Sequence, residues 1–89
     1  MIIALPFENN NIFSPFEHAM SFKIYEIEND KIVTMRFIPS TDVQKLKIHA
    51  ILCSCIGDDI KAALTGKNIS VHTGYSGNAD MAVKTFLGR

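Results

Sequence analysis

The feature that most limits the fold of this chain is a short run near its middle, HAILCSC, from His49 to Cys55. The run is apolar almost throughout. Such runs are typical of central parallel strands that are covered on both faces. Because a parallel strand needs a crossover connection, usually a helix, the run predicts an α/β fold with helices on both sides of a sheet.

Before this run, the sequence predicts one strand followed by a hairpin. Residues Ile2–Pro6 form a short apolar stretch typical of a buried strand. Residues 7–19, which include consecutive asparagines and a proline, are expected to form a loop. Apolar and polar residues then alternate over 21–39, and the pair Asn29-Asp30 tolerates the positive φ of a tight hairpin turn.

After the hairpin, helical and strand patterns alternate, which implies right-handed crossovers and helices on both faces of the sheet. A capping Ser40 or Thr41 begins the first helical pattern, and acidic residues begin the second. We therefore expect a mixed sheet of five strands, in the order strand, strand, strand, helix, strand, helix, strand, helix. The later elements are a helix over 40–48, a strand over 49–55, a helix over 57–66, a strand over 69–73 and a helix over 79–88.

The amino-acid composition argues against some classes of function. Nine Lys and Arg residues balance nine Asp and Glu residues, so the formal net charge is zero and the basic footprint of a nucleic-acid binder is missing. No apolar run approaches the roughly 20 residues of a membrane span, and the first residues lack the basic region of a signal peptide. We expect a single cytoplasmic domain over residues 1–89, without nucleic-acid or membrane partners.

Ligands of open α/β sheets bind outside the carboxyl ends of the parallel strands. Three loops are expected to leave that edge here, at residues 7–19, 55–58 and 72–78. The first is long for so small a domain, and long ordered loops are often functional. The sequence therefore places a candidate crevice at this edge.

The two cysteines receive different interpretations. Cys53 lies inside the predicted strand and is expected to pack against a helix, since free cysteine is among the most buried residue types. Cys55 lies at the exit of the strand beside a helix N-terminus, which favours a thiolate, although Asp58 and Asp59 oppose it. Cys55 is therefore either a ligand or reactive thiol, or a small packed residue. Their spacing suits neither a mutual disulfide nor a four-ligand zinc site.

Histidines and glycines complete the candidate site. His18 ends the long first loop and is either an exposed or capping residue or a ligand. His72, at the end of the last strand, is either a site residue or a partly buried polar residue, and His49 belongs at the opposite edge. The amides of GYSGN, residues 74–78, precede a helix and either cradle an anion or form a simple turn.

Taken in order, these pieces resemble the nitrogenase iron–molybdenum cofactor-binding family, whose dinitrogenase accessory factor-like domains carry metal clusters or their precursors. The resemblance covers nearly the whole chain and implies a three-layer α/β/α ribonuclease H-like fold. It depends on the first strand and on the segments FSPFEHAMSFKIYEIENDKI, CIGDDIKAALTGKNISV and TGYSGNADMAVKTFLG.

The chain departs from the family pattern in two places. Members commonly carry His-Phe-Gly-x-Ala in the first loop, where residues 15–19 of this chain read PFEHA. His18 thus occupies the variable position, which is often basic or histidine. The segment between Pro39 and His49 is also shorter than in relatives, which usually have a longer helix there.

The resemblance implies a non-enzymatic carrier of an iron–sulfur or molybdenum-containing cluster, with a cluster-delivering or cluster-accepting protein as partner. Cys55 and His18 would be the metal ligands, since thiolate and imidazole suit such clusters. Backbone amides near Gly57 and at Gly74 and Gly77 would hold its negative charge.

The alternative is an interaction or regulatory module that keeps the fold without a ligand, which the missing signature histidine favours. In either case the chain is expected to be a monomer or a weak homodimer formed through the exposed edge of the hairpin. A nuclease is disfavoured, because the first strand carries none of the carboxylates that two metal ions would need.

Overall fold

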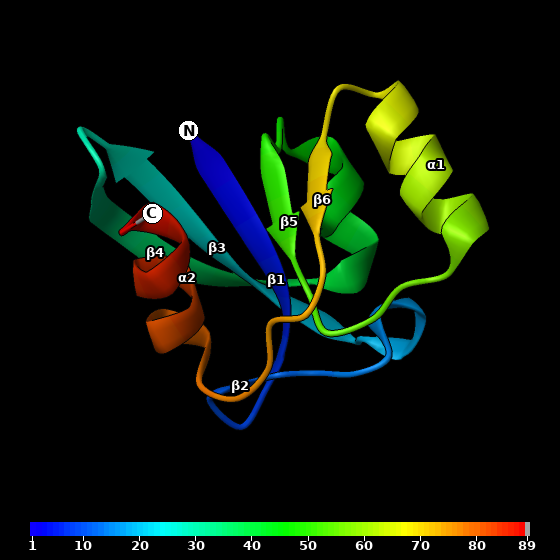
Figure 1. The fold of residues 1–89 in the computed structure, drawn as a ribbon, viewed down its shortest axis with the longest axis horizontal. Helices are drawn as coiled ribbons and strands as arrows, with labels where there is room; N and C mark the ends of the chain where they lie inside the picture. The colour runs from blue at the N-terminus through cyan, green and yellow to red at the C-terminus, as the bar shows by residue number, and fades with distance from the viewer. Residues whose placement is uncertain (89) are drawn as a thin grey trace.

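The computed structural model describes residues 1–88, apart from the side chain of residue 44 (Figure 1). Its centre is a mixed six-stranded sheet in the order β4-β3-β1-β5-β6, with the short β2 paired to β1. The strands are β1 (Ile2–Glu8), β2 (Asn11–Ile12), β3 (Ser21–Glu28), β4 (Lys31–Pro39), β5 (Ala50–Leu52) and β6 (Ser70–His72). The helices are α1 (Asp58–Gly66) and α2 (Ala79–Leu87), with short 3-10 helices η1 (Phe16–His18) and η2 (Ser40–Lys45).

The predicted mixed α/β fold is confirmed. β3 and β4 form the expected antiparallel hairpin, and Asn29 and Asp30 adopt positive φ angles of 53° and 61° in its turn. β5 pairs in parallel with β1 on one side and with β6 on the other. All three residues of β5 are buried, as expected of a strand covered on both faces.

Two expected details are wrong. The sheet has six strands rather than five, because Asn9 and Asn10 adopt φ angles of 52° and 68° and turn the chain back so that β2 pairs with the end of β1. Asparagine is one of the few non-glycine residues that enter this region readily.

The segment after Pro39 forms the 3-10 helix η2 instead of the expected α-helix. Its β-branched Thr41 and Val43 are poor helix formers, and six residues are too few for a stable α-helix.

Apolar side chains cover both faces of the sheet, because alternate residues of each strand point to opposite sides. Figure 1 shows α2 on one side of the sheet and η2, in green, on the other. On the α2 face, Tyr25, Leu52 and neighbouring strand residues pack against Ala82 and Val83. On the opposite face, Ile24, Ile51 and Cys53 form a second cluster, against which residues of η2 and α1 pack.

β4 forms an open edge of the sheet. Val33, Met35 and Phe37 alternate along it and are exposed, which leaves an apolar stripe on this strand. None of the helices within residues 1–88 combines the length and apolar character that crossing a membrane requires.

A buried cation ties α2 to the sheet. Lys23 on β3 is only 8% exposed, and its ammonium lies 2.7 Å from a carboxylate oxygen of Asp80 at the start of α2. The same oxygen accepts a hydrogen bond from the hydroxyl of Tyr25. The rings of Phe7, Tyr25 and Phe37 surround the ammonium, with centroids 5.2–5.4 Å away. Lys23 is thus compensated by one carboxylate and by the faces of three aromatic rings.

This arrangement shifts two pKa values in opposite directions. The hydrogen bond from Lys23, followed by that from Tyr25, holds the pKa of Asp80 below its ordinary value. Burial, reinforced by the bond to Asp80, raises the pKa of Tyr25 above its ordinary value. Tyr25 therefore stays neutral and Asp80 stays ionised over the physiological pH range.

We expect Asp80→Asn to lower the free energy of unfolding at pH 7 by about 1 kcal/mol, because the buried ammonium of Lys23 loses its counterion. The partial exposure of the carboxylate keeps this effect below the usual range for charged hydrogen bonds. Urea unfolding at a series of pH values measures it.

The contribution of Asp80 is complete above the ordinary carboxyl pKa of about 4 and is lost as the pH falls through its lower value in the folded protein. The native chain should therefore lose stability more steeply than Asp80→Asn on acidification below about pH 5. Glu28→Gln, at an exposed position of β3, serves as the control. Parallel pH profiles for the native chain and Asp80→Asn would contradict the proposed ion pair.

Candidate functional site

Three loops meet at the carboxyl edge of the parallel strands β1, β5 and β6, as the sequence predicted. Backbone hydrogen bonds join the first loop to the second, the second to the third, and the third to the first. These bonds run from Phe16 N to Cys55 O (3.3 Å), from Tyr75 N to Cys53 O (3.1 Å) and from Ile12 N to Gly77 O (2.8 Å). The edge is therefore a connected rim rather than three independent loops.

Cys55 lies at this rim with its side chain exposed. Its sulfur is 3.3 Å from the hydroxyl oxygen of Ser14 in the first loop. Because β5 ends at Leu52, the chain has left the sheet by the time it reaches Cys55. Of the two interpretations of Cys55, a small packed residue is excluded by this exposure, and the thiol is accessible.

Cys53 is buried, with no exposed surface, and belongs to the apolar cluster on the face opposite α2. Burial raises the pKa of its thiol to about 11, so the group is protonated at neutral pH. The packed role predicted for Cys53 is confirmed.

The backbone amide of Gly57, at the N-terminus of α1, is occupied by a side chain of the protein itself. Its N–H donates a hydrogen bond of 2.8 Å to the carboxylate of Glu17. A Cβ on residue 57 would stand 2.7 Å from that carboxylate oxygen, so a larger residue there would make the Glu17 side chain shift. Glu17 thus takes the position in which an external anion would meet this helix terminus.

The glycines of the third loop shape the rim through their backbone. Gly74 and Gly77 have φ angles of +86° and +80°, a region that favours glycine. The N–H of Gly74 donates to the carbonyl of Ser54, which holds the loop against the end of β5. Asn78 then caps α2, because its side-chain oxygen accepts from the N–H of Met81.

His18 lies in the 3-10 helix η1 and is exposed. Its backbone N–H donates to the carbonyl of Pro15 at 3.1 Å. Within residues 1–88, the side chain that hydrogen bonds to Cys55 is that of Ser14, not that of His18. The structure therefore places His18 in the loop that borders Cys55, and in the part of the chain that it describes no hydrogen bond joins the two side chains.

The other two histidines have structural partners. A ring nitrogen of His72 lies 3.2 Å from the hydroxyl of Ser70, and its ring packs edge-on against Phe86. His49 accepts a hydrogen bond from the N–H of Ile2 at the start of β1, at the edge opposite the rim. The placement of His49 away from the candidate site is confirmed.

Ser14 and Glu17 are the rim residues that sequence reasoning missed. A serine before a proline reads only as a loop residue, and nothing local indicates that its hydroxyl faces a cysteine far along the chain. Glu17 stands where the family signature has glycine, which was the one available signal. Both contacts arise from pairing between distant segments.

The rim carries few side chains that could bind a metal ion. Among the described residues, no group of three or more His, Cys, Asp or Glu side chains is arranged to hold a metal ion. The rim offers an exposed thiol with a hydroxyl beside it, and an imidazole in the neighbouring 3-10 helix. This set does not make a site for a resident metal ion among the described residues.

The sequence profile of the family described as "Dinitrogenase iron-molybdenum cofactor" matches residues 1–89. The chain belongs to this family. No match is found among curated proteins.

Solved proteins share the fold, among them PH0822 and mj0327. The crystal structure of PH0822 aligns with a TM-score of 0.91 and 21% sequence identity, over 99% of this chain and 89% of that one. A protein of Methanocaldococcus jannaschii, mj0327, provisionally described as a dinitrogenase, aligns with a TM-score of 0.85 and 20% identity, over 99% of this chain and 88% of that one. At such identities the likeness shows the fold alone.

We expect one thiol of the folded protein to react with a chromogenic disulfide reagent at pH 7.5, because Cys55 is exposed while Cys53 is buried and protonated. Cys55→Ser should abolish the reaction until the protein is unfolded. Cys53→Ser should keep it, while losing about 1–3 kcal/mol of stability through its buried hydroxyl. Equal reaction rates for both thiols in the folded protein would show that the assignment of Cys53 to the core is wrong.

Proposed function

We propose that this chain binds an iron–sulfur or molybdenum-containing cluster, or its precursor, as cargo at the rim and passes it to another protein. Membership of the dinitrogenase iron–molybdenum cofactor family supports a role connected with that cofactor. The observation that carries the proposal is the exposed thiol of Cys55 at the junction of three hydrogen-bonded loops. In this proposal the protein is a cytoplasmic binding protein and not an enzyme.

Cys55 is the proposed anchor and His18 the second ligand. A thiolate and an imidazole suit iron- and molybdenum-containing clusters. The hydroxyl of Ser14 would donate to the Cys55 thiolate and stabilise its charge. With so few protein ligands, the cargo keeps coordination positions open to the protein that receives it, as a carrier requires.

The proposed amide contacts differ in what they require. Gly77 borders the rim through its loop, whereas the N–H of Gly74 already donates to the carbonyl of Ser54. The amide of Gly57 already binds Glu17, so an anionic cargo would reach it only after displacing that carboxylate. Glu17 and the acidic first turn of α1 oppose a negative cargo, and this opposition weakens binding.

One observation favours a second function, that of an interaction or regulatory module without a ligand. The carboxylate of Glu17 satisfies the Gly57 amide at 2.8 Å, as an external anion would. In that case the side chain replaces the ligand permanently, and the fold is kept for contact with another protein. The open edge of β4 offers a route to a weak homodimer in either case.

We also propose that residues 1–89 form one domain and that its layers correspond to the ribonuclease H-like arrangement. The support is that the apolar clusters lie on both faces of the sheet and that the family match spans the whole chain.

Anaerobic titration with iron–sulfur and molybdenum-containing donors, followed by visible absorption, tests the proposal. The native chain should acquire the absorption of a bound cluster, and Cys55→Ser should lose it. His18→Ala and Ser14→Ala should weaken binding by about tenfold each. Cys53→Ala, which removes the buried thiol, is the matched control and should bind as the native chain does.

The Glu17→Ala variant distinguishes the cluster carrier from the module without a ligand. If the chain is a carrier, this variant should bind the cluster more tightly than the native chain, because the competing carboxylate is gone. A native chain and a Glu17→Ala variant that both stay colourless would reject the carrier and favour the module. Unchanged affinity in Cys55→Ser would reject the rim as the site even if a cluster binds.

A further inference from the structure

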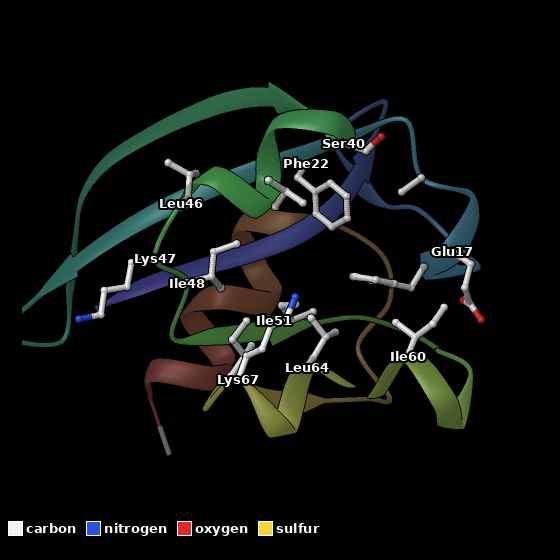
Figure 2. Close-up of a pocket in the computed structure, with 14 residues that line it drawn as sticks. Glu17, Phe22, Ser40, Leu46, Lys47, Ile48, Ile51, Ile60, Leu64 and Lys67 are labelled. Atoms are coloured by element: carbon white, nitrogen blue, oxygen red, sulfur yellow. The ribbon is translucent and has the colours of Figure 1, made fainter. Parts of the chain in front are cut away.

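A hollow lies on the sheet face opposite α2; it borders the rim at Phe16 and Glu17, but Cys55 does not line it. It is a pocket of about 480 Å³ between η2 on one side and α1 on the other (Figure 2). This volume is within the range of small-molecule sites. Its apolar lining comes from the sheet through Phe22 and Ile51, from Ile48 just before β5, and from α1 through Ile60 and Leu64.

The pocket exists because two elements leave this face partly uncovered. η2 is one short 3-10 helix, which covers the face with Val43 and with the following Leu46. α1 has no buried residue along its length, whereas α2 buries three on the other face. Ile60 and Leu64 of α1 therefore face the hollow while remaining half-exposed.

A charged side chain without an ion-pair partner in the described part of the chain lies at the edge of this apolar space. Lys67, an exposed residue just after α1, lines the pocket, and Figure 2 shows its side chain extending toward the pocket, whereas that of Lys47 points away. Within residues 1–88, the two ion pairs are Lys23 with Asp80 and Lys45 with Asp42, so Lys67 has no carboxylate partner. Glu17, at the opposite end, is already bound to the Gly57 amide.

We propose that this pocket binds a small amphipathic carboxylate of the medium-chain fatty acid class, with its tail on the isoleucines and Leu64 and its carboxylate on Lys67. A neutral apolar ligand would fill the apolar lining but gain nothing from the exposed ammonium of Lys67 at its edge. A small hydrophilic anion would leave the apolar lining in contact with water. A ligand with one negative end and one apolar body satisfies both parts of the pocket. This site shares Glu17 with the rim but does not include Cys55, the proposed anchor of the cluster.

Titration of isotope-labelled protein with decanoate, followed by NMR, tests the proposal. Decanoate should give saturable shifts at Ile51, Ile60 and Leu64, while acetate and decanol, which lack the tail and the charge respectively, should bind at least about tenfold more weakly. Lys67→Met keeps an apolar stem and should weaken decanoate binding by about tenfold. Lys47→Met is the matched control and should leave it unchanged.

Two further variants keep the test decisive. Val43→Trp enlarges a half-exposed residue of the pocket wall and should abolish decanoate binding while circular dichroism shows an intact fold. Cys55→Ser should bind decanoate like the native chain, so the outcome is separate from that of the cluster proposal. Equal binding of decanoate and decanol, native affinity in Lys67→Met, or shifts confined to the stripe of Val33, Met35 and Phe37 would each overturn the proposal.

Discussion

The structure depends on the burial of β5 between two layers of side chains. Its three residues pair in parallel with β1 and β6, and they contribute to the apolar clusters on both faces. Parallel pairing fixes the direction of all three strands, so their following loops must leave from one edge. The position of the rim, and of Cys55 within it, follows from this single strand.

Much of this arrangement could be predicted from the sequence, because the relevant signals are local. The apolar run around β5, the alternation in the hairpin and the Asn29-Asp30 turn each indicate structure within a few residues. The turn at Asn9 and Asn10 carried the same kind of signal but stood in a segment that otherwise resembles a loop. η2 differs from the expected helix because a weak helical pattern cannot hold an α-helix without a longer apolar stripe.

The candidate site was predicted less completely than the fold. The sequence placed Cys55 and the three loops at one edge, because strand direction decides both. The contacts of Ser14 with Cys55 and of Glu17 with Gly57 join residues that are about forty positions apart, and no local pattern encodes them. The contact of Glu17 with Gly57 also makes the rim more negative, because it adds a carboxylate to an already acidic helix N-terminus.

The separation of the two cysteines has a consequence for oxidation. Cys53 is enclosed in the core, Cys55 faces solvent, and the sequence has no other cysteine. A disulfide between these two cysteines, which are separated by a single residue, would strain the backbone and draw Cys53 out of its packing. A sulfenic acid formed on Cys55 therefore lacks a resolving thiol within the same molecule, and its route to a disulfide passes through a small-molecule thiol or a second protein.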